Sequence, residues 1–225
     1  MRVLNGVLAY HPLERLDVNT SYTNTLRQVN QVDDVRSSVL QALVSARLLD
    51  TLRADLTLER STQDDFTNLR EIEHWVAGAT LVAKLMPHLE LTLGYHDDQA
   101  DVSGPGAGLV PDPSEKRTQM IWLFRPSEQL TAQIEIDWLE NYANSGIDQR
   151  SRIDWIPFER GSLDVQLDLD RIEAGSTTQS QIDRMRAQAR YTITPRAFLE
   201  LSFSMQDPSD AERTELVTLM FNFSS

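Results

Sequence analysis

Strict alternation of apolar and polar residues is the feature of this sequence that most restricts how the chain folds. The stretch Leu163–Asp170 reads Leu-Asp-Val-Gln-Leu-Asp-Leu-Asp. A repeat of two is the period of a β-strand, because successive side chains of a strand point to opposite faces of its sheet. Similar segments lie on either side, at 150–156 and 185–191. The three segments together predict a sheet with one apolar and one charged face.

The charges of the first two segments fall at matching positions. A four-residue turn at Glu159–Ser162 that keeps like faces together places Arg152 opposite Asp168. Arg150 is then opposite Asp170. The charges therefore help to select this register.

The third segment supplies a second basic strand. A register that places Arg186 opposite Asp168 also places Arg190 opposite the carboxyl group of Asp164. Opposite charges directly across a ladder contribute about 0.2–1 kcal/mol per pair. We predict an acidic strand between two basic ones, with a solvated polar face of no functional meaning as the alternative interpretation.

The same alternation continues along the chain. It predicts about thirteen strands of roughly 8–13 residues, joined alternately by tight turns and longer connections. Polar connections are expected at Arg27–Asp34 and, as the longest irregular segment, at Asp97–Lys116. Ser38–Leu49 and Gln179–Gln188 have some helical periodicity but lie where the meander requires strands. The predicted fold is all-β, an antiparallel up-and-down meander in a single domain over residues 1–225.

Composition excludes several classes of function. The net charge of −13 argues against a nucleic-acid-binding surface, which needs clustered Lys and Arg. The chain has no cysteine, so disulfides and thiolate metal sites are excluded, and no cofactor or metal is expected. No run of apolar residues is long enough for a transmembrane helix, but membrane strands are recognised by alternation and not by hydropathy.

The strand pattern resembles that of the bacterial outer-membrane β-barrel class, in which strands of about ten residues are apolar outside and polar inside. The resemblance covers nearly the whole chain as a pattern, without a specific motif. It implies a transmembrane β-barrel, or part of one, in the bacterial outer membrane, with the lipid bilayer as its surroundings. A protein partner in the lumen is left open. The last strand, Leu219–Ser225, is similar to the alternating C-terminal strand of the class but ends in serine.

Aromatic residues form two groups that resemble the interfacial girdles of such barrels. The group beside the tight turns consists of Tyr10, Phe124, Phe158, Tyr191 and Phe198. The group toward the longer connections consists of Trp75, Tyr95, Trp138 and Tyr142. An ordinary enrichment of aromatic residues in strands is the alternative.

Strand parity predicts that the chain is the C-terminal portion of a larger barrel. Bacterial single-chain barrels have an even number of strands, so a thirteenth strand leaves one edge unmatched. The N-terminal residues also lack a convincing signal peptide. A miscounted strand is the simpler alternative.

The inward charges are the candidate functional residues. The predicted pore-lining set is Arg150, Arg152, Asp164, Asp168, Asp170, Arg186, Arg190, Arg117 and Asp137, with Arg117 facing Asp137. Opposed rows of fixed charge can line a water-filled pore, or they can fill a wall that does not conduct. The function is therefore predicted as a porin-like channel or a structural sheath. Unpaired inward acids, Glu135, Glu200 and Glu90, favour a slight preference for cations.

Two further functions are kept as alternatives. A soluble or periplasmic β-sheet could bind a partner through its apolar face. An outer-membrane barrel hydrolase could use His74, which the predicted turn at Lys84–His88 places opposite Asp98 with His96 diagonal to it. Omptin proteases of the outer membrane work with Asp and His at that end of their barrel. The sequence has no Gly-x-Ser-x-Gly motif, and the prediction is that the chain is not an enzyme and has no catalytic residue.

Overall fold

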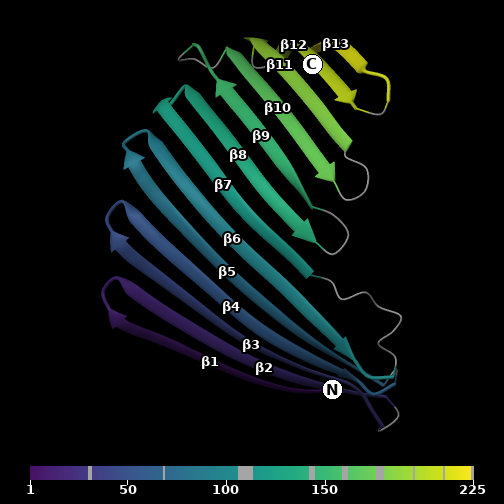
Figure 1. Cartoon of the computed structure of the whole chain (residues 1–225). Coiled ribbons are helices and arrows are strands. Elements are labelled where there is room, and N and C mark those ends of the chain that lie inside the picture. The colour runs from purple at the N-terminus through teal and green to yellow at the C-terminus, as the bar shows by residue number, and fades with distance from the viewer. Residues whose placement is uncertain are drawn as a thin grey trace. The chain divides into compact units, whose positions relative to one another are not determined.

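The computed structural model describes residues 1–29, 32–67, 69–105, 114–141, 145–158, 162–175, 180–194, 196–209 and 211–223. Thirteen strands form one sheet whose strand order is the chain order, as Figure 1 shows. The strand pairs with a defined register are antiparallel. The predicted all-β up-and-down meander is confirmed. Within the described residues, no helix has the length and apolar character needed to cross a membrane.

The strand bounds are β1 (Arg2–Leu13), β2 (Leu16–Val29), β3 (Val32–Leu49), β4 (Leu52–Asp65), β5 (Arg70–Met86), β6 (Leu89–Ser103), β7 (Ser114–Ser127), β8 (Leu130–Asn141), β9 (Ser145–Trp155), β10 (Leu163–Gly175), β11 (Ser180–Thr194), β12 (Ala197–Pro208) and β13 (Thr214–Phe223).

Several strands are longer than the sequence pattern predicts. β3 has 18 residues and β5 has 17. The predicted connection Arg27–Asp34 lies largely in β2 and β3, and both ends of the predicted irregular segment Asp97–Lys116 are strand. The predicted strand ends were wrong because the outward residues become polar there. This removes the alternation of apolar and polar residues, although the backbone hydrogen bonds between strands continue. The predicted turn at Glu159–Ser162 falls outside the described residues except for Ser162.

The chain divides into two compact units. The first comprises Met1–Ala83, Leu93–Thr118 and Glu140–Tyr142. The second comprises Lys84–Thr92, Gln119–Leu139 and Ala143–Ser225. The ladders among β1 to β4 belong to the first unit, and those among β9 to β13 belong to the second.

In the first unit, one face of the sheet carries an apolar band. Its cross-strand rows are Leu16–Ala46–Ala54–Leu81, Val18–Val44–Leu56–Ala79 and Thr20–Ala42–Leu58–Ala77. The row Tyr22–Leu40–Arg60–Trp75 bounds the band, and the row beyond it, Asn24–Ser38–Thr62–Glu73, is polar. Arg60 marks the boundary, because its guanidinium lies 4.8 Å from the Trp75 ring centre and its Nη2 is 2.6 Å from Glu73 Oε1. A further row pairs Leu52 with Ala83, so the band covers nine residues of β5, from Trp75 to Ala83, close to the length that crosses a hydrocarbon core.

The second unit repeats this arrangement. Its apolar rows are Val165–Ala189–Leu201–Leu219, Leu167–Ala187–Phe203–Val217 and Leu169–Met185–Met205, and the next row is Arg171–Asp183–Asp207. Arg171 donates from Nε to Asp183 Oδ1 at 2.8 Å and from Nη2 to Oδ2 at 3.3 Å. The strands therefore continue beyond the apolar band, and the face that carries the band becomes polar there. We call this extension the polar collar.

Burial is the reverse of that in a soluble protein. Leu219 is 67% exposed, Leu8 65% and Leu58 60%, and none of the large side chains among the described residues is fully buried. Two of the most buried residues are charged instead, Asp137 at 4% and Asp65 at 6% exposure. A soluble domain stabilises itself by removing apolar side chains from water. This sheet needs an apolar environment outside itself.

Two glycines in the first unit give a testable contrast. Gly104 has φ of +103°, and a Cβ added there would lie 2.4 Å from the carbonyl oxygen of Leu69. Gly78 has no atom closer than 3.7 Å to such a Cβ. Gly104→Ala is expected to cost about 1–3 kcal/mol and to increase limited proteolysis near Leu69, because strain and a backbone clash coincide. Gly78→Ala is the control, and equal cleavage of the two variants would contradict this account.

Candidate functional site

The charged face of β9, β10 and β11 has the register that the sequence predicts. Asp168 pairs with Arg152 on β9 and with Arg186 on β11. Arg150 is opposite Asp170. The acidic strand lies between two basic ones, and the predicted cross-strand partners, including Arg190 opposite Asp164, are confirmed.

The contacts of the β9 arginines are different from the predicted ones. Arg150 donates to Asp148 on its own strand, and Arg152 Nε lies 2.9 Å from Asp154 Oδ2, also on β9. Between the described residues of β9 and β10, the only ion pair is the longer contact of 3.9 Å from Arg152 Nε to Asp168 Oδ1. The predicted mutual neutralisation of β9 and β10 is therefore only partly correct.

Strand geometry explains the preference for partners on the same strand. Residues two apart point to the same face and lie about 6.6–6.8 Å apart along the strand, a distance that a long side chain spans. The same spacing joins Arg53 to Asp55 at 2.9 Å, Gln166 to Asp168 at 2.7 Å and Gln133 to Glu135 at 3.4 Å. The register alone does not determine which charges meet.

Two arginines of β11 are left without such partners. Arg184 is opposite Asp170 and Arg186 is opposite Asp168, yet neither guanidinium forms a hydrogen bond or ion pair with the described residues. Arg184 is not in the predicted pore-lining set, because the third alternating segment begins at Met185. The signal was present, since the register of Arg186 against Asp168 also sets Arg184 against Asp170.

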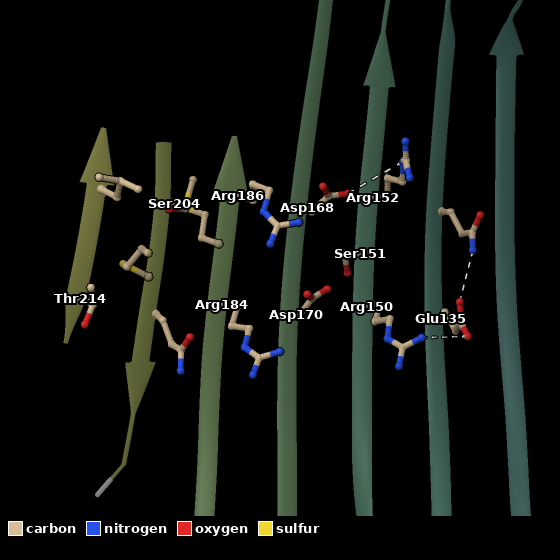
Figure 2. A pocket seen from close by; sticks show the side chains of 15 residues that line it. Glu135, Arg150, Ser151, Arg152, Asp168, Asp170, Arg184, Arg186, Ser204 and Thr214 are labelled. Carbon is tan, nitrogen blue, oxygen red and sulfur yellow. Dashed lines mark hydrogen bonds and ion pairs between the residues drawn. The ribbon is translucent and has the colours of Figure 1, made fainter. Parts of the chain in front are cut away.

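These residues line a cavity of about 590 Å³ in the second unit. Figure 2 shows the side chains of Arg150, Arg152, Arg184 and Arg186 around it, with the carboxylates between them. Its charged lining residues are four arginines and three acids, Glu135, Asp168 and Asp170. The cavity therefore has a net positive lining in a chain whose net charge is −13. We call it the arginine cavity.

Glu135 is not the unpaired inward acid that was predicted. It accepts hydrogen bonds from Gln119 at 2.9 Å and from Gln133 at 3.4 Å, and its Oε1 is 3.9 Å from Arg150 Nη1. One of the three acids used to predict a cation preference is thus already engaged. The other two, Glu200 and Glu90, do not line the arginine cavity.

The remaining candidate residues are more dispersed. Arg190 is stacked on Phe198, with 3.8 Å between its Cζ and the ring centre. Phe198 therefore lies on the charged face, and its predicted place in an outward girdle was wrong because the alternation of β12 assigns outward positions to odd numbers. Arg117 belongs to the first unit and Asp137 to the second, so their predicted pairing stays a prediction.

Other aromatic residues of the predicted girdles are exposed. Tyr10, Phe124, Phe158 and Tyr191 beside the tight turns have exposed side chains, as have Trp75, Tyr95 and Trp138 toward the other end. Tyr142 lies outside the described residues.

The predicted proximity of His74 and Asp98 is confirmed in the first unit. His74 Nε2 is hydrogen-bonded to Asp98 Oδ1, and both side chains are about one-third exposed. A histidine and a carboxylate alone do not define a catalytic site. That the chain is not an enzyme stays a prediction.

No protein-family model matches the sequence, and no curated protein matches it either. Solved structures are similar in fold at low sequence identity. OccD3 (OpdP) of Pseudomonas aeruginosa has a TM-score of 0.50 and 10% identity over 96% of this chain and 67% of its own. OccAB4 of Acinetobacter baumannii has a TM-score of 0.50 and 8% identity over 96% of this chain and 63% of its own. A structure of the FpvAI–pyocin S2 complex has a TM-score of 0.54 and 10% identity over 98% of this chain and 44% of its own.

These neighbours are bacterial outer-membrane β-barrel proteins. The chain has their antiparallel strand fold. It spans about two thirds of OccD3 and OccAB4 and less than half of the chain in the FpvAI complex. Identities of this size show the fold and not the solute or partner.

Proposed function

We propose that this chain is embedded in the bacterial outer membrane as a porin-like β-barrel, or part of one, whose charged face lines a water-filled passage for solutes. The observation that carries the proposal is the opposition of the two faces. In the second unit, one face carries the apolar rows and the other carries the arginine cavity. The first unit by itself also carries an apolar band of membrane length on one face. A lipid bilayer outside and water inside satisfy both faces.

The outward band favours this function over a soluble binding module. A soluble sheet would cover its apolar face within its own fold, but large side chains such as Leu8 and Phe221 are exposed. The charged face, in turn, favours a channel over a sheath. Arg184 and Arg186 have no hydrogen-bond or ion-pair partner among the described residues, and such arginines are stable only where water or a solute solvates them.

Conductance of the purified chain in a planar bilayer tests the proposal. We expect discrete conductance steps in KCl, and Ser204→Trp should reduce the step size because Ser204 lines the arginine cavity. Phe203→Trp is the matched control, since Phe203 is the neighbouring residue on the apolar face. A membrane-inserted chain without conductance would favour a structural sheath. Equal effects of the two substitutions would contradict the assignment of the faces.

A further inference from the structure

We propose that Arg184 and Arg186 form a binding site for the anionic group of a solute, a carboxylate or a phosphate, inside the arginine cavity. This inference rests on the proposed function, because the cavity must be reached by water and solutes. It adds a ligand class and two residues that bind it.

The first argument is the distribution of partners. On β9, Arg150 is engaged by Asp148 and Glu135, and Arg152 by Asp154. On β10, Asp168 already accepts a hydrogen bond from Gln166 at 2.7 Å and lies near Arg152. Glu135 and Asp168, two of the three acids that line the cavity, thus have other partners, and Asp170 remains opposite Arg184. The two β11 guanidiniums form no hydrogen bond or ion pair within the described residues, and the four arginines of the lining exceed its three acids.

The second argument is geometry. Arg184 and Arg186 occupy successive inward positions of one strand, about 6.6–6.8 Å apart along it. Figure 2 shows both guanidiniums beside the cavity, without a dashed contact to any other residue drawn. A guanidinium is a planar fork that donates two parallel hydrogen bonds to a carboxylate or phosphate. Two forks at this spacing suit one multiply charged group or two groups of one solute.

The third argument is the composition of the opposite side of the site. β12 and β13 place Ser204, Gln206 and Thr214 along the cavity, next to the two arginines. These side chains carry hydroxyl and amide donors and no negative charge. An anion between β11 and β12 therefore meets donors on both sides and no directly adjacent carboxylate on β12. Asp170, opposite Arg184 on β10, keeps the site weak enough for a bound solute to leave.

Inorganic phosphate is the probe for the binding test. Its affinity is measured from phosphorus NMR line broadening with the full chain in detergent micelles, a readout that does not require conduction. The double variant Arg184→Gln/Arg186→Gln is expected to bind phosphate at least about tenfold more weakly than wild type, because two charge-assisted donors are lost.

A second double variant controls for net charge. Arg47→Gln/Arg53→Gln removes the same two charges from cross-strand partners in the first unit. It should leave phosphate affinity within about twofold of wild type, because neither arginine lines the arginine cavity. Equal losses in the two double variants would overturn the site and leave only a general effect of charge.

The lysine variant Arg184→Lys/Arg186→Lys keeps the experiment decisive if the glutamine variant does not fold. It preserves the charge but not the planar fork, so an intermediate affinity is expected. Wild-type affinity in the lysine variant would overturn the guanidinium site. Circular dichroism of every variant verifies that the strands are formed.

Conductance recorded in parallel separates this inference from the proposed function. If the chain conducts but the Arg184/Arg186 variants lose no more phosphate binding than the Arg47/Arg53 control, the anion site is overturned and the channel stands. Selective loss without conduction would support the anion site and count against the channel.

Discussion

Leu167→Arg is expected to destabilise the folded chain in a bilayer by about 2–4 kcal/mol, the penalty for a cationic side chain at mid-depth on a lipid-facing barrel surface. Leu167 is in the middle of the outward band, between Ile153 on β9 and Ala187 on β11. An arginine there has neither water around it nor an acidic side chain directly opposite it on the neighbouring strands. Denaturant unfolding of the chain reconstituted in vesicles measures the change.

Gln166→Arg is the control for this substitution. Gln166 is one residue away on the charged face, opposite Asp154, and its amide already donates to Asp168. An arginine is therefore expected to be tolerated, with a change below about 1 kcal/mol. Similar losses for the two substitutions would mean that both faces are in contact with the same solvent.

Asp65→Ala is expected to cost about 1.5–3 kcal/mol, because it removes a charge-assisted hydrogen bond whose acceptor is nearly fully buried. Asp65 is 6% exposed, and Arg70 Nε donates to its Oδ2 at 3.1 Å. Without Asp65, the Arg70 guanidinium is left partly buried with its charge less compensated. The change is measured by the same unfolding experiment.

Asp50→Ala removes an ion pair of similar length from an exposed position. Asp50 Oδ1 lies 3.2 Å from Arg15 Nη2, but the Asp50 side chain is 85% exposed. Such pairs contribute little, so a change below about 1 kcal/mol is expected. If Asp50→Ala were as damaging as Asp65→Ala, burial would not be what makes the Asp65 pair important.

Sheet topology and register could be predicted because two independent patterns agree. Alternation assigns each residue to a face, and a one-residue slip would move every side chain to the wrong one. The charges of Arg152, Asp168 and Arg186 then select among the registers that remain, and the structure has the selected one. The outer-membrane barrel class was recognisable for the same reason, and it is confirmed at the level of the fold.

Strand ends could not be predicted from the same patterns. In the polar collar the face that carries the apolar band becomes polar, so the alternation that marks a strand is lost there. Backbone hydrogen bonds keep β3 and β6 extended through Asp33 and Asp98 all the same. The predicted connections were therefore too long and the strands too short.

The contacts within the site were only partly predictable. Registers define which residues are opposite, whereas Arg150 and Arg152 select acids on their own strand. That choice depends on side-chain reach and rotamers, which alternation does not encode. The same limitation concealed that Arg184 and Arg186 lack partners among the described residues, because this follows from how the acids around them are used.

The pairing of Arg150 with Asp148 and of Arg152 with Asp154 also bears on the order in which the sheet assembles. Acid and base are covalently held two residues apart, so they meet as soon as β9 is extended, before β8 or β10 is in place. Closing a contact over two residues loses far less chain entropy than closing one between strands. The arginines of β9 can thus be neutralised by acids of the same strand from the earliest stage of folding. Pairing with β10 then adds a further contact to charges that are already compensated within β9.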